Sequence, residues 1–188
     1  MAVEYNVAYR TLLTSSEYEL LIKQFEGCPS NSQTNYYFDT KRFTLKASDI
    51  TLRVKRKDSL QIGLKRKKNY NQIDIPADIT EKEFQEILDT GVINIKSISQ
   101  EIAPFIKDQL LVNYLTLTTY RIFLPYKHGI LAIDKVDYLG MTDYELEFQA
   151  SNAYSGKDEF VQTVKELGIK YKKAEPKLKR AFNELKNQ

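Results

Sequence analysis

At 188 residues and a formal net charge of +3, the chain has the length of one ordinary domain, and its 42% hydrophobic residues, 13 Tyr and 9 Phe exclude a disordered protein and favour strands. The one cysteine, Cys28, excludes an intrachain disulfide and a zinc site built from cysteines. No apolar run approaches the ~20 residues of a membrane-spanning helix, and the N-terminus lacks a signal-peptide pattern, so we expect a cytoplasmic protein of one domain over residues 1–188 with no membrane partner.

The chain begins with the pattern of a strand followed by a helix. Residues 5–10 alternate between larger apolar and more polar side chains, and a period of two predicts a strand. The run from Thr14 to Glu17 has the spacing of a capping box, in which each of the two side chains bonds the backbone N–H of the other. It predicts a helix to about residue 26, ended by Gly27. Short strands are expected at residues 35–39 and 43–45.

Two strongly basic strands are predicted at residues 51–55 and 61–67. Their apolar residues fall on one face, and Arg53, Lys55, Lys65 and Lys67 fall on the other. Residues 51–68 carry eight Lys or Arg and one Asp, a net charge of +7, whereas the rest of the chain carries −4. Such a local positive charge predicts a site for a polyanion, with phosphate as the first candidate. The alternative is a solvated sheet edge on which lysines oppose aggregation.

The rest of the chain alternates helices with further strands. A second capping box, from Thr80 to Glu83, begins a helix that Gly91 ends, and another helix is expected at about residues 99–109. Period-two patterns predict strands near residues 119–124, 131–134 and 143–148. Helices at about residues 157–167 and 175–185 close the chain. The predicted fold class is therefore α+β.

The polar faces of these strands carry charges that are sorted by sign. The cations are Arg10, Arg53, Lys55, Lys65, Lys67 and Arg121, and the anions are Asp39, Asp134, Asp143, Glu145 and Glu147. If the sheet closes into a β-barrel with its apolar face outward under the helices, all of them project into one charged lumen. Phosphates would satisfy such cations, and Mg²⁺ or Mn²⁺ would satisfy clustered carboxylates. The combination predicts a site for a metal and a polyphosphate.

Several motifs together resemble the CYTH, or triphosphate tunnel metalloenzyme, superfamily, especially its short bacterial members. They are YYFDT at residues 36–40, LRVK at 52–55, GLK at 63–65, LTTYR at 117–121, PYKHGILAID at 125–134, YLGMTDYELEF at 138–148 and PKLKR at 176–180. The resemblance covers nearly the whole chain. It implies an eight-stranded antiparallel β-barrel, the triphosphate tunnel, with a charged lumen and helices packed on the outside.

The resemblance also implies a function and its residues. Members of the superfamily hydrolyse inorganic triphosphate, thiamine triphosphate or RNA 5′-triphosphate ends, and some cyclise ATP. By motif, phosphate would be held by Arg53, Lys55, Lys65, Arg121, Lys177 and Arg180, to which the strand pattern adds Arg10 and Lys67. Mg²⁺ or Mn²⁺ would be held by Glu145 and Glu147, with Asp134 nearby. The expected partner is a triphosphate-containing small molecule or polyphosphate.

The first strand departs from the pattern of the superfamily. The signature Glu-x-Glu-x-Lys is here Asn6-x-Ala8-x-Arg10, and Phe123 stands where a further acid is common. Losing anionic ligands weakens the binding of a divalent cation. Two hypotheses stay open: a metal-dependent triphosphatase, which is a phosphoric anhydride hydrolase, or a non-catalytic receptor for a triphosphate, polyphosphate or nucleotide.

Other polar residues are expected to lie outside the site. Arg56, Lys57, Arg66 and Lys68 fall on the opposite face of the hairpin or at its ends, and we interpret them as solvated charges. The one histidine, His128, lies in a predicted turn and is expected to have no catalytic role. No recognition helix or aromatic stacking platform accompanies the cations, so duplex nucleic acid is not expected as a partner.

Overall fold

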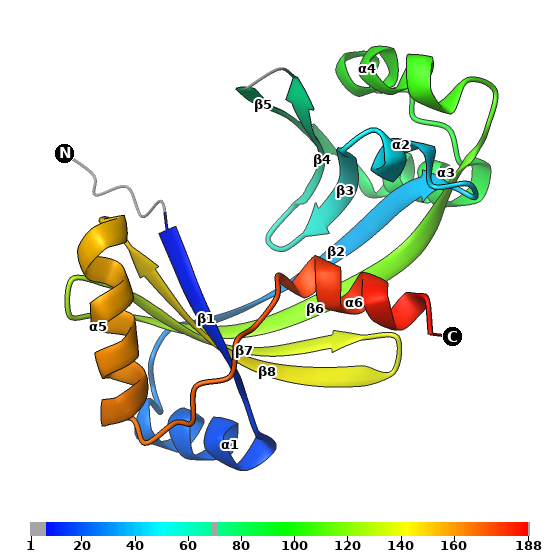
Figure 1. Cartoon of the computed structure of the whole chain (residues 1–188). Coiled ribbons are helices and arrows are strands. Elements are labelled where there is room, and N and C mark those ends of the chain that lie inside the picture. Colours follow the sequence, from blue (N-terminus) through cyan, green and yellow to red (C-terminus); the bar gives the residue numbers. More distant parts are fainter. Residues whose placement is uncertain (1–6, 69–70, 188) are drawn as a thin grey trace. The chain divides into compact units, whose positions relative to one another are not determined.

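The computed structural model describes residues 7–68 and 71–187 of the chain, which contain eight strands and six helices (Figure 1). The strands are β1 (Val7–Leu13), β2 (Ser30–Thr40), β3 (Ile50–Arg56), β4 (Leu60–Lys68), β5 (Asn71–Ile79), β6 (Leu111–Tyr126), β7 (Gly129–Tyr138) and β8 (Met141–Ala150). The helices are α1 (Ser15–Gln24), α2 (Thr44–Ala47), α3 (Glu81–Thr90), α4 (Lys96–Ile106), α5 (Ala153–Glu166) and α6 (Lys177–Leu185). Of the predicted residues, Asn6 and the side chain of Lys67 lie outside the described part.

The strands form one sheet in the order β1-β8-β7-β6-β2-β3-β4-β5. The registers of β1 with β8, β7 with β8, β2 with β3, β3 with β4 and β4 with β5 are all antiparallel. The prediction of an α+β fold with an eight-stranded antiparallel sheet is therefore confirmed. None of the helices in the described residues has the length and apolar character needed to cross a membrane.

The chain divides into two compact units. One, here the terminal unit, combines Met1–Ser32 with Thr118–Gln188, and the other, here the central unit, is Gln33–Leu117. Each has its own apolar core. The expectation of a single domain over residues 1–188 stays a prediction.

In the central unit, the apolar face of the basic hairpin packs under helices. Leu52 and Val54 of β3 and Ile62 and Leu64 of β4 are buried in one cluster with residues of α3 and α4. Because side chains alternate along a strand, Arg53, Lys55 and Lys65 lie on the opposite face. The predicted separation of apolar and basic faces is confirmed.

Arg56 and Arg66 differ from the expected solvated charges. Arg56 pairs with Glu81 of α3 at 2.5 Å, and Arg66 pairs with Glu101 of α4 at 2.6 Å. These ion pairs link α3 and α4 to the β3–β4 hairpin, on the face opposite to Arg53.

The short strand expected at residues 43–45 is wrong, because α2 begins there. The backbone turns at Phe43, whose φ of 54° is left-handed. The buried carboxylate of Asp39 accepts hydrogen bonds from the N–H groups of Leu45 and Lys46, both at 2.9 Å. Asp39 thus holds the start of this helix and is not one of the lumen anions that the sequence suggested.

Strand β5 was missed by the pattern analysis. Pro76 in β5 has no N–H to donate to a neighbouring strand, so its presence argued against a strand here. However, β5 is the last strand in the sheet order, where proline is tolerated. Pro76 lies opposite Gly63 in the β4–β5 register.

In the terminal unit, the core lies on one face of β7 and β8. Leu131 and Ile133 of β7 pack with Leu146 and Phe148 of β8 and with residues of α1 and α5. The residues that alternate with them along the strands, including Asp134 and Glu145, face the other side of the sheet. The predicted faces of both strands are confirmed.

The capping-box glutamates allow a test of how the terminal unit is held together. Both Glu17 of α1 and Glu83 of α3 accept a bond from the N–H of their capping threonine at 2.7 Å, but Glu17 also accepts one from the N–H of Lys170, at 3.2 Å. Burial raises the pKa of Glu17, but the hydrogen bonds from Thr14 and Lys170 lower it by more, so its pKa lies below the usual value.

We expect Glu17→Ala to lower the free energy of unfolding at pH 7 by about 1 kcal/mol, and by more than Glu83→Ala, because it also loses the bond to the Lys170 segment. Since the folded pKa of Glu17 is depressed, this stabilisation is present above the unfolded pKa of about 4.3 and is lost as the pH falls through the folded value. Urea denaturation at pH 7 and pH 3 measures both effects. Equal losses for the two variants at pH 7 would contradict the role of Lys170.

Candidate functional site

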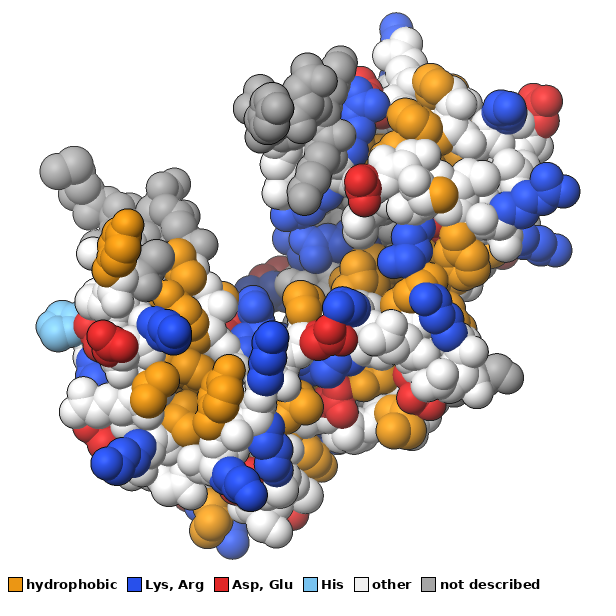
Figure 2. Space-filling view, viewed as in Figure 1, with side chains coloured by type: hydrophobic (Ala, Val, Ile, Leu, Met, Phe, Trp, Pro, Cys, Tyr) orange, Lys and Arg blue, Asp and Glu red, His pale blue; other side chains and the backbone are white. Residues whose placement is uncertain are grey.

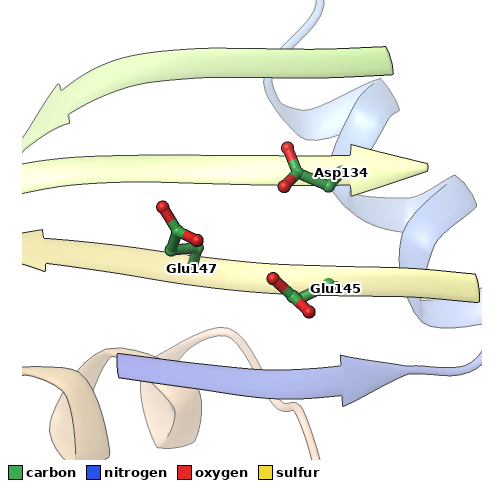
Figure 3. Close-up of side chains that lie close together, drawn as sticks. All are labelled: Asp134, Glu145 and Glu147. Carbon is green, nitrogen blue, oxygen red and sulfur yellow. The ribbon is translucent and has the colours of Figure 1, made fainter. Parts of the chain in front are cut away.

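Three buried carboxylates gather on the polar face of β7 and β8 (Figure 3). Asp134 of β7 lies directly opposite Glu145 of β8, and Glu147 lies two residues further along β8. One oxygen of each lies within 4.8 Å of the others, and the three residues are 0%, 0% and 4% exposed. We call Asp134, Glu145 and Glu147 the carboxylate cluster. The sequence predicted these three as metal ligands, and the structure brings them together.

Two arginines from neighbouring strands contact the carboxylate cluster. Arg121 of β6 donates from Nε and Nη2 to the two oxygens of Asp134, both at 2.7 Å, and its Nη2 lies 3.3 Å from Glu147. Arg10 of β1 donates from Nε to Glu147 at 2.9 Å. A fork of two parallel bonds is the strongest arrangement for a guanidinium and a carboxylate, and it fixes the orientation of Asp134.

Helix α6 brings two further cations to the same face. Lys177, its first residue, places Nζ 2.5 Å from Asp134, 3.1 Å from Glu145 and 3.9 Å from Glu147. Arg180 donates to Glu145 at 2.7 Å and to Asp143 at 2.9 Å. Lys177 and Arg180 are three residues apart, so they lie on one face of the helix.

These contacts leave the group electrically balanced. Within the described residues, the carboxylate cluster and Asp143 supply four negative charges, and Arg10, Arg121, Lys177 and Arg180 supply four positive ones. One oxygen, Oε1 of Glu145, has no aligned hydrogen bond, yet it lies 3.1 Å from the ammonium of Lys177 and 3.6 Å from Nε of Arg10. At these distances the attraction is electrostatic and does not need an aligned donor, so the oxygen is compensated.

The opposition between burial and ion pairing shifts the pKa values of several groups in this network. Burial raises the pKa of Glu147, but the charges of Arg121, Lys177 and Arg10 and a hydrogen bond from Gln149 lower it by more, so Glu147 is ionised well below neutral pH. Burial lowers the pKa of Arg121, but the carboxylate cluster raises it by more. The same opposition, with Glu145 and Asp143 as partners, raises the pKa of Arg180.

Tyr138 extends this network at the end of β7. Its hydroxyl donates to Asp143 at 2.6 Å. Burial, this bond and the charge of Asp143 raise the pKa of Tyr138 to about 12. Sequence reasoning did not identify this tyrosine; the spacing of Tyr138 and Asp143 across the tight β7–β8 turn is the signal that could have found it.

The predicted basic residues of the central unit form a different kind of surface. Arg53 and Lys55 of β3 and Lys65 of β4 line a cavity of about 320 Å³, together with Gln61, Gly63, Asp74 and Pro76. We call Arg53, Lys55 and Lys65 the basic wall. In the space-filling view, Lys and Arg side chains gather over the β3–β4 hairpin (Figure 2).

The cations of the basic wall are only partly paired. Lys65 lies 3.1 Å from Asp74, and both are about half exposed. Arg53 and Lys55 have no ion pair within residues 7–68 and 71–187. A Cβ at Gly63 would meet nothing within 4 Å, which leaves open space beside Arg53. The basic wall is therefore free to bind an anion, whereas the cations around the carboxylate cluster are already engaged.

The donor set of the carboxylate cluster fits a hard divalent cation. Mg²⁺, Mn²⁺ and Ca²⁺ prefer carboxylate oxygens, and a group of three such oxygens matches that preference. β1 adds no acid in its described residues: Ala8 lies opposite Gln149 on the polar face, two residues from Arg10. Phe123, two residues from Arg121 on β6, adds none either. A divalent cation would therefore depend on Asp134, Glu145 and Glu147.

The sequence reasoning set two residues aside, His128 and Cys28. His128 is exposed and lies 3.2 Å from Glu159. Cys28 is a half-buried free thiol.

Comparison with known proteins identifies relatives over nearly the whole length. The model of the CYTH domain family matches residues 4–182. Among curated proteins, YjbK of Bacillus subtilis (strain 168), provisionally named a triphosphatase, is 24% identical over 193 residues, covering 98% of this chain and 97% of that protein.

Solved structures share the fold. A Bacillus halodurans protein provisionally named an adenylate cyclase superimposes with a TM-score of 0.75 and 26% identity, covering 95% of this chain and 98% of that one. HpAC1 from Hippeastrum, provisionally named an adenylyl cyclase and described as having a dominant triphosphatase activity, gives a TM-score of 0.73 at 19% identity, with 94% of each chain covered. The predicted superfamily and fold class are confirmed.

The difference between Arg121, which is ion-paired, and Arg53, which is not within the described residues, can be tested by measuring the free energy of unfolding. We expect Arg121→Met to lower the free energy of unfolding by about 3 kcal/mol, because it removes both bonds to the buried Asp134. Arg53→Met, the matched change on the basic wall, should alter it by no more than about 0.5 kcal/mol. Urea denaturation at pH 7 measures both. Similar losses for the two variants would contradict the assignment of Arg53 as an open cation.

Proposed function

Because the chain belongs to the CYTH domain family, we propose that it binds triphosphate groups and hydrolyses them with a divalent cation. The observation that carries this proposal is the gathering of three buried carboxylates beside Arg121 and Lys177. Three adjacent buried carboxylates are a donor set that hard divalent cations prefer. The provisional name of YjbK as a triphosphatase supports the same reaction, as does the dominant triphosphatase activity described for HpAC1.

Phosphate oxygens are the proposed ligands of the basic residues. Guanidinium groups bind phosphate through two parallel bonds, and an ammonium binds it as a point charge. The proposed phosphate-binding residues are Arg10, Arg53, Lys55, Lys65, Lys67, Arg121, Lys177 and Arg180. The unpaired Arg53 and Lys55 are the first to consider, because they need not give up a partner before they bind.

Asp134, Glu145 and Glu147 are the proposed ligands of Mg²⁺ or Mn²⁺. Such an ion, when bound, neutralises phosphate charge and makes phosphorus more open to attack by water. Arg121 and Arg10 orient the carboxylates through their bonds to Asp134 and Glu147. We propose that the same arginines also stabilise negative charge that develops on a leaving phosphate.

A second candidate is a receptor that binds triphosphate without hydrolysis. It is favoured by Ala8, which places a methyl group where relatives of this superfamily are expected to carry a carboxylate, and by the charge balance that the protein reaches with its own cations. The two candidates differ in turnover and share the ligand.

The catalytic proposal is tested with inorganic triphosphate, Mg²⁺ or Mn²⁺, and a phosphate-release assay. We expect Glu147→Gln to lower turnover at least about 100-fold, because it removes one anionic metal ligand. Glu166→Gln, the same change at a surface glutamate that pairs with Lys127 at 2.7 Å, should leave turnover unchanged. Triphosphate binding without turnover in the unmodified protein, even after Asn6→Glu and Ala8→Glu are combined, would favour the receptor.

Binding itself is tested on the basic wall by titration calorimetry with inorganic triphosphate. We expect Arg53→Met and Lys55→Met each to weaken binding at least about tenfold, since each removes a charge-assisted contact. Arg56→Met is the control, because Arg56 lies on the opposite face and pairs with Glu81. If the unmodified protein does not bind triphosphate measurably, both candidate functions are overturned. If Arg56→Met weakens binding as much as the two other variants do, the assignment of the basic wall is overturned.

A further inference from the structure

The ammonium of Lys177 lies among all three members of the carboxylate cluster. Its Nζ is 2.5 Å from Oδ2 of Asp134, 3.1 Å from Oε1 of Glu145 and 3.9 Å from Oε2 of Glu147. Oxygens of these same residues lie within 4.8 Å of one another and form the candidate metal group (Figure 3). A cation of the protein thus already contacts the ligands that a divalent ion would use.

The other cations of the network reach fewer of these carboxylates. Arg180 contacts Glu145 and directs its second contact to Asp143. Arg121 contacts Asp134 and Glu147, and Arg10 contacts Glu145 and Glu147. Within the described residues, Lys177 is the cation that touches the whole cluster. Its single positive charge on a compact ammonium also resembles a metal ion more than a planar guanidinium does.

We propose that Lys177 is the internal counter-cation of the carboxylate cluster and competes directly with the divalent ion. The inference rests on the proposed assignment of Asp134, Glu145 and Glu147 as metal ligands. A divalent ion bound by one oxygen of each carboxylate would lie where the ammonium of Lys177 now lies, and the repulsion between the two cations at such short distance is large where water is excluded. Metal binding therefore requires the ammonium to leave, and the metal-free protein keeps its carboxylates compensated without an ion.

The position of Lys177 allows such a departure. It is the first residue of α6, follows Pro176, and its side chain is 18% exposed, so a rotation of the side chain moves the ammonium toward solvent without breaking the helix. Asp134 then keeps its two bonds from Arg121. Exchange of the ammonium for a divalent ion raises the charge of the network by one, which suits a phosphate ligand. A phosphate that takes up the released ammonium favours the exchange, so triphosphate and metal are expected to bind cooperatively.

The competition is tested with Mn²⁺ alone, in the absence of triphosphate. Titration calorimetry and the electron paramagnetic resonance signal of free Mn²⁺ measure its affinity for the full chain. We expect Lys177→Met to bind Mn²⁺ at least about tenfold more tightly than the unmodified protein, because it removes the competing charge. Lys177→Arg, which keeps a cation, should not bind more tightly. Lys179→Met is the matched control, since Lys179 lies on the same helix and pairs with Glu175.

Thermal melts without metal show whether each variant is folded, and Lys177→Gln replaces Lys177→Met if the latter does not fold. Equal Mn²⁺ affinity of the unmodified protein and Lys177→Met, or an equal gain in Lys179→Met, would overturn the inference and leave the proposed function intact. Failure of every variant to bind Mn²⁺ would overturn the inference together with the metal assignment on which it rests. Tighter binding in Lys177→Met alone supports it.

Discussion

The structure around the candidate site depends on the compensation of three buried carboxylates. Asp134, Glu145 and Glu147 lie on one face of β7 and β8, and the opposite face of these strands is the apolar core of the terminal unit. Ionised groups in this position are stable only if opposite charges reach them. Those charges come from β1, β6 and α6, which are far apart in sequence. Ion pairing therefore joins β1, the end of β6 and α6 to β7 and β8 within the terminal unit.

The cations of the basic wall, unlike those around the carboxylate cluster, are mostly not ion-paired within the described part of the protein. The side chains of Arg53 and Lys55 find no ionic partner among the described residues, and Asp74 compensates only Lys65. On a half-exposed surface, water satisfies such cations at little cost, so they remain available to an anion. The two groups thus differ in what a ligand must displace. A phosphate would displace water at Arg53, whereas a metal at Asp134 would displace a charged side chain of the protein.

Local rules predicted much of the fold and part of the site. The period of two placed Arg53, Asp134 and Glu145 on the polar faces, and two capping boxes marked the starts of α1 and α3. The errors have specific physical causes. Asp39 binds backbone N–H groups at the start of α2, an interaction that a strand pattern does not contain, and Pro76 is tolerated in β5 because that strand ends the sheet order. The contacts of Lys177 depend on where α6 docks, which is set by tertiary packing and leaves no local signal.

The presence of Ala8 in β1 is consistent with the charge balance of the network around the carboxylate cluster. A carboxylate at position 8 would lie on the polar face of β1, two residues from Arg10, and would add a negative charge beside Glu147. With Ala8 and Phe123 in place, the described network contains equal numbers of positive and negative groups and is compensated without a metal. The fold therefore needs no divalent ion to neutralise these carboxylates, because Lys177 and the arginines already supply the charge. On the proposed exchange, a divalent ion would be needed only when a phosphate ligand takes up the ammonium of Lys177.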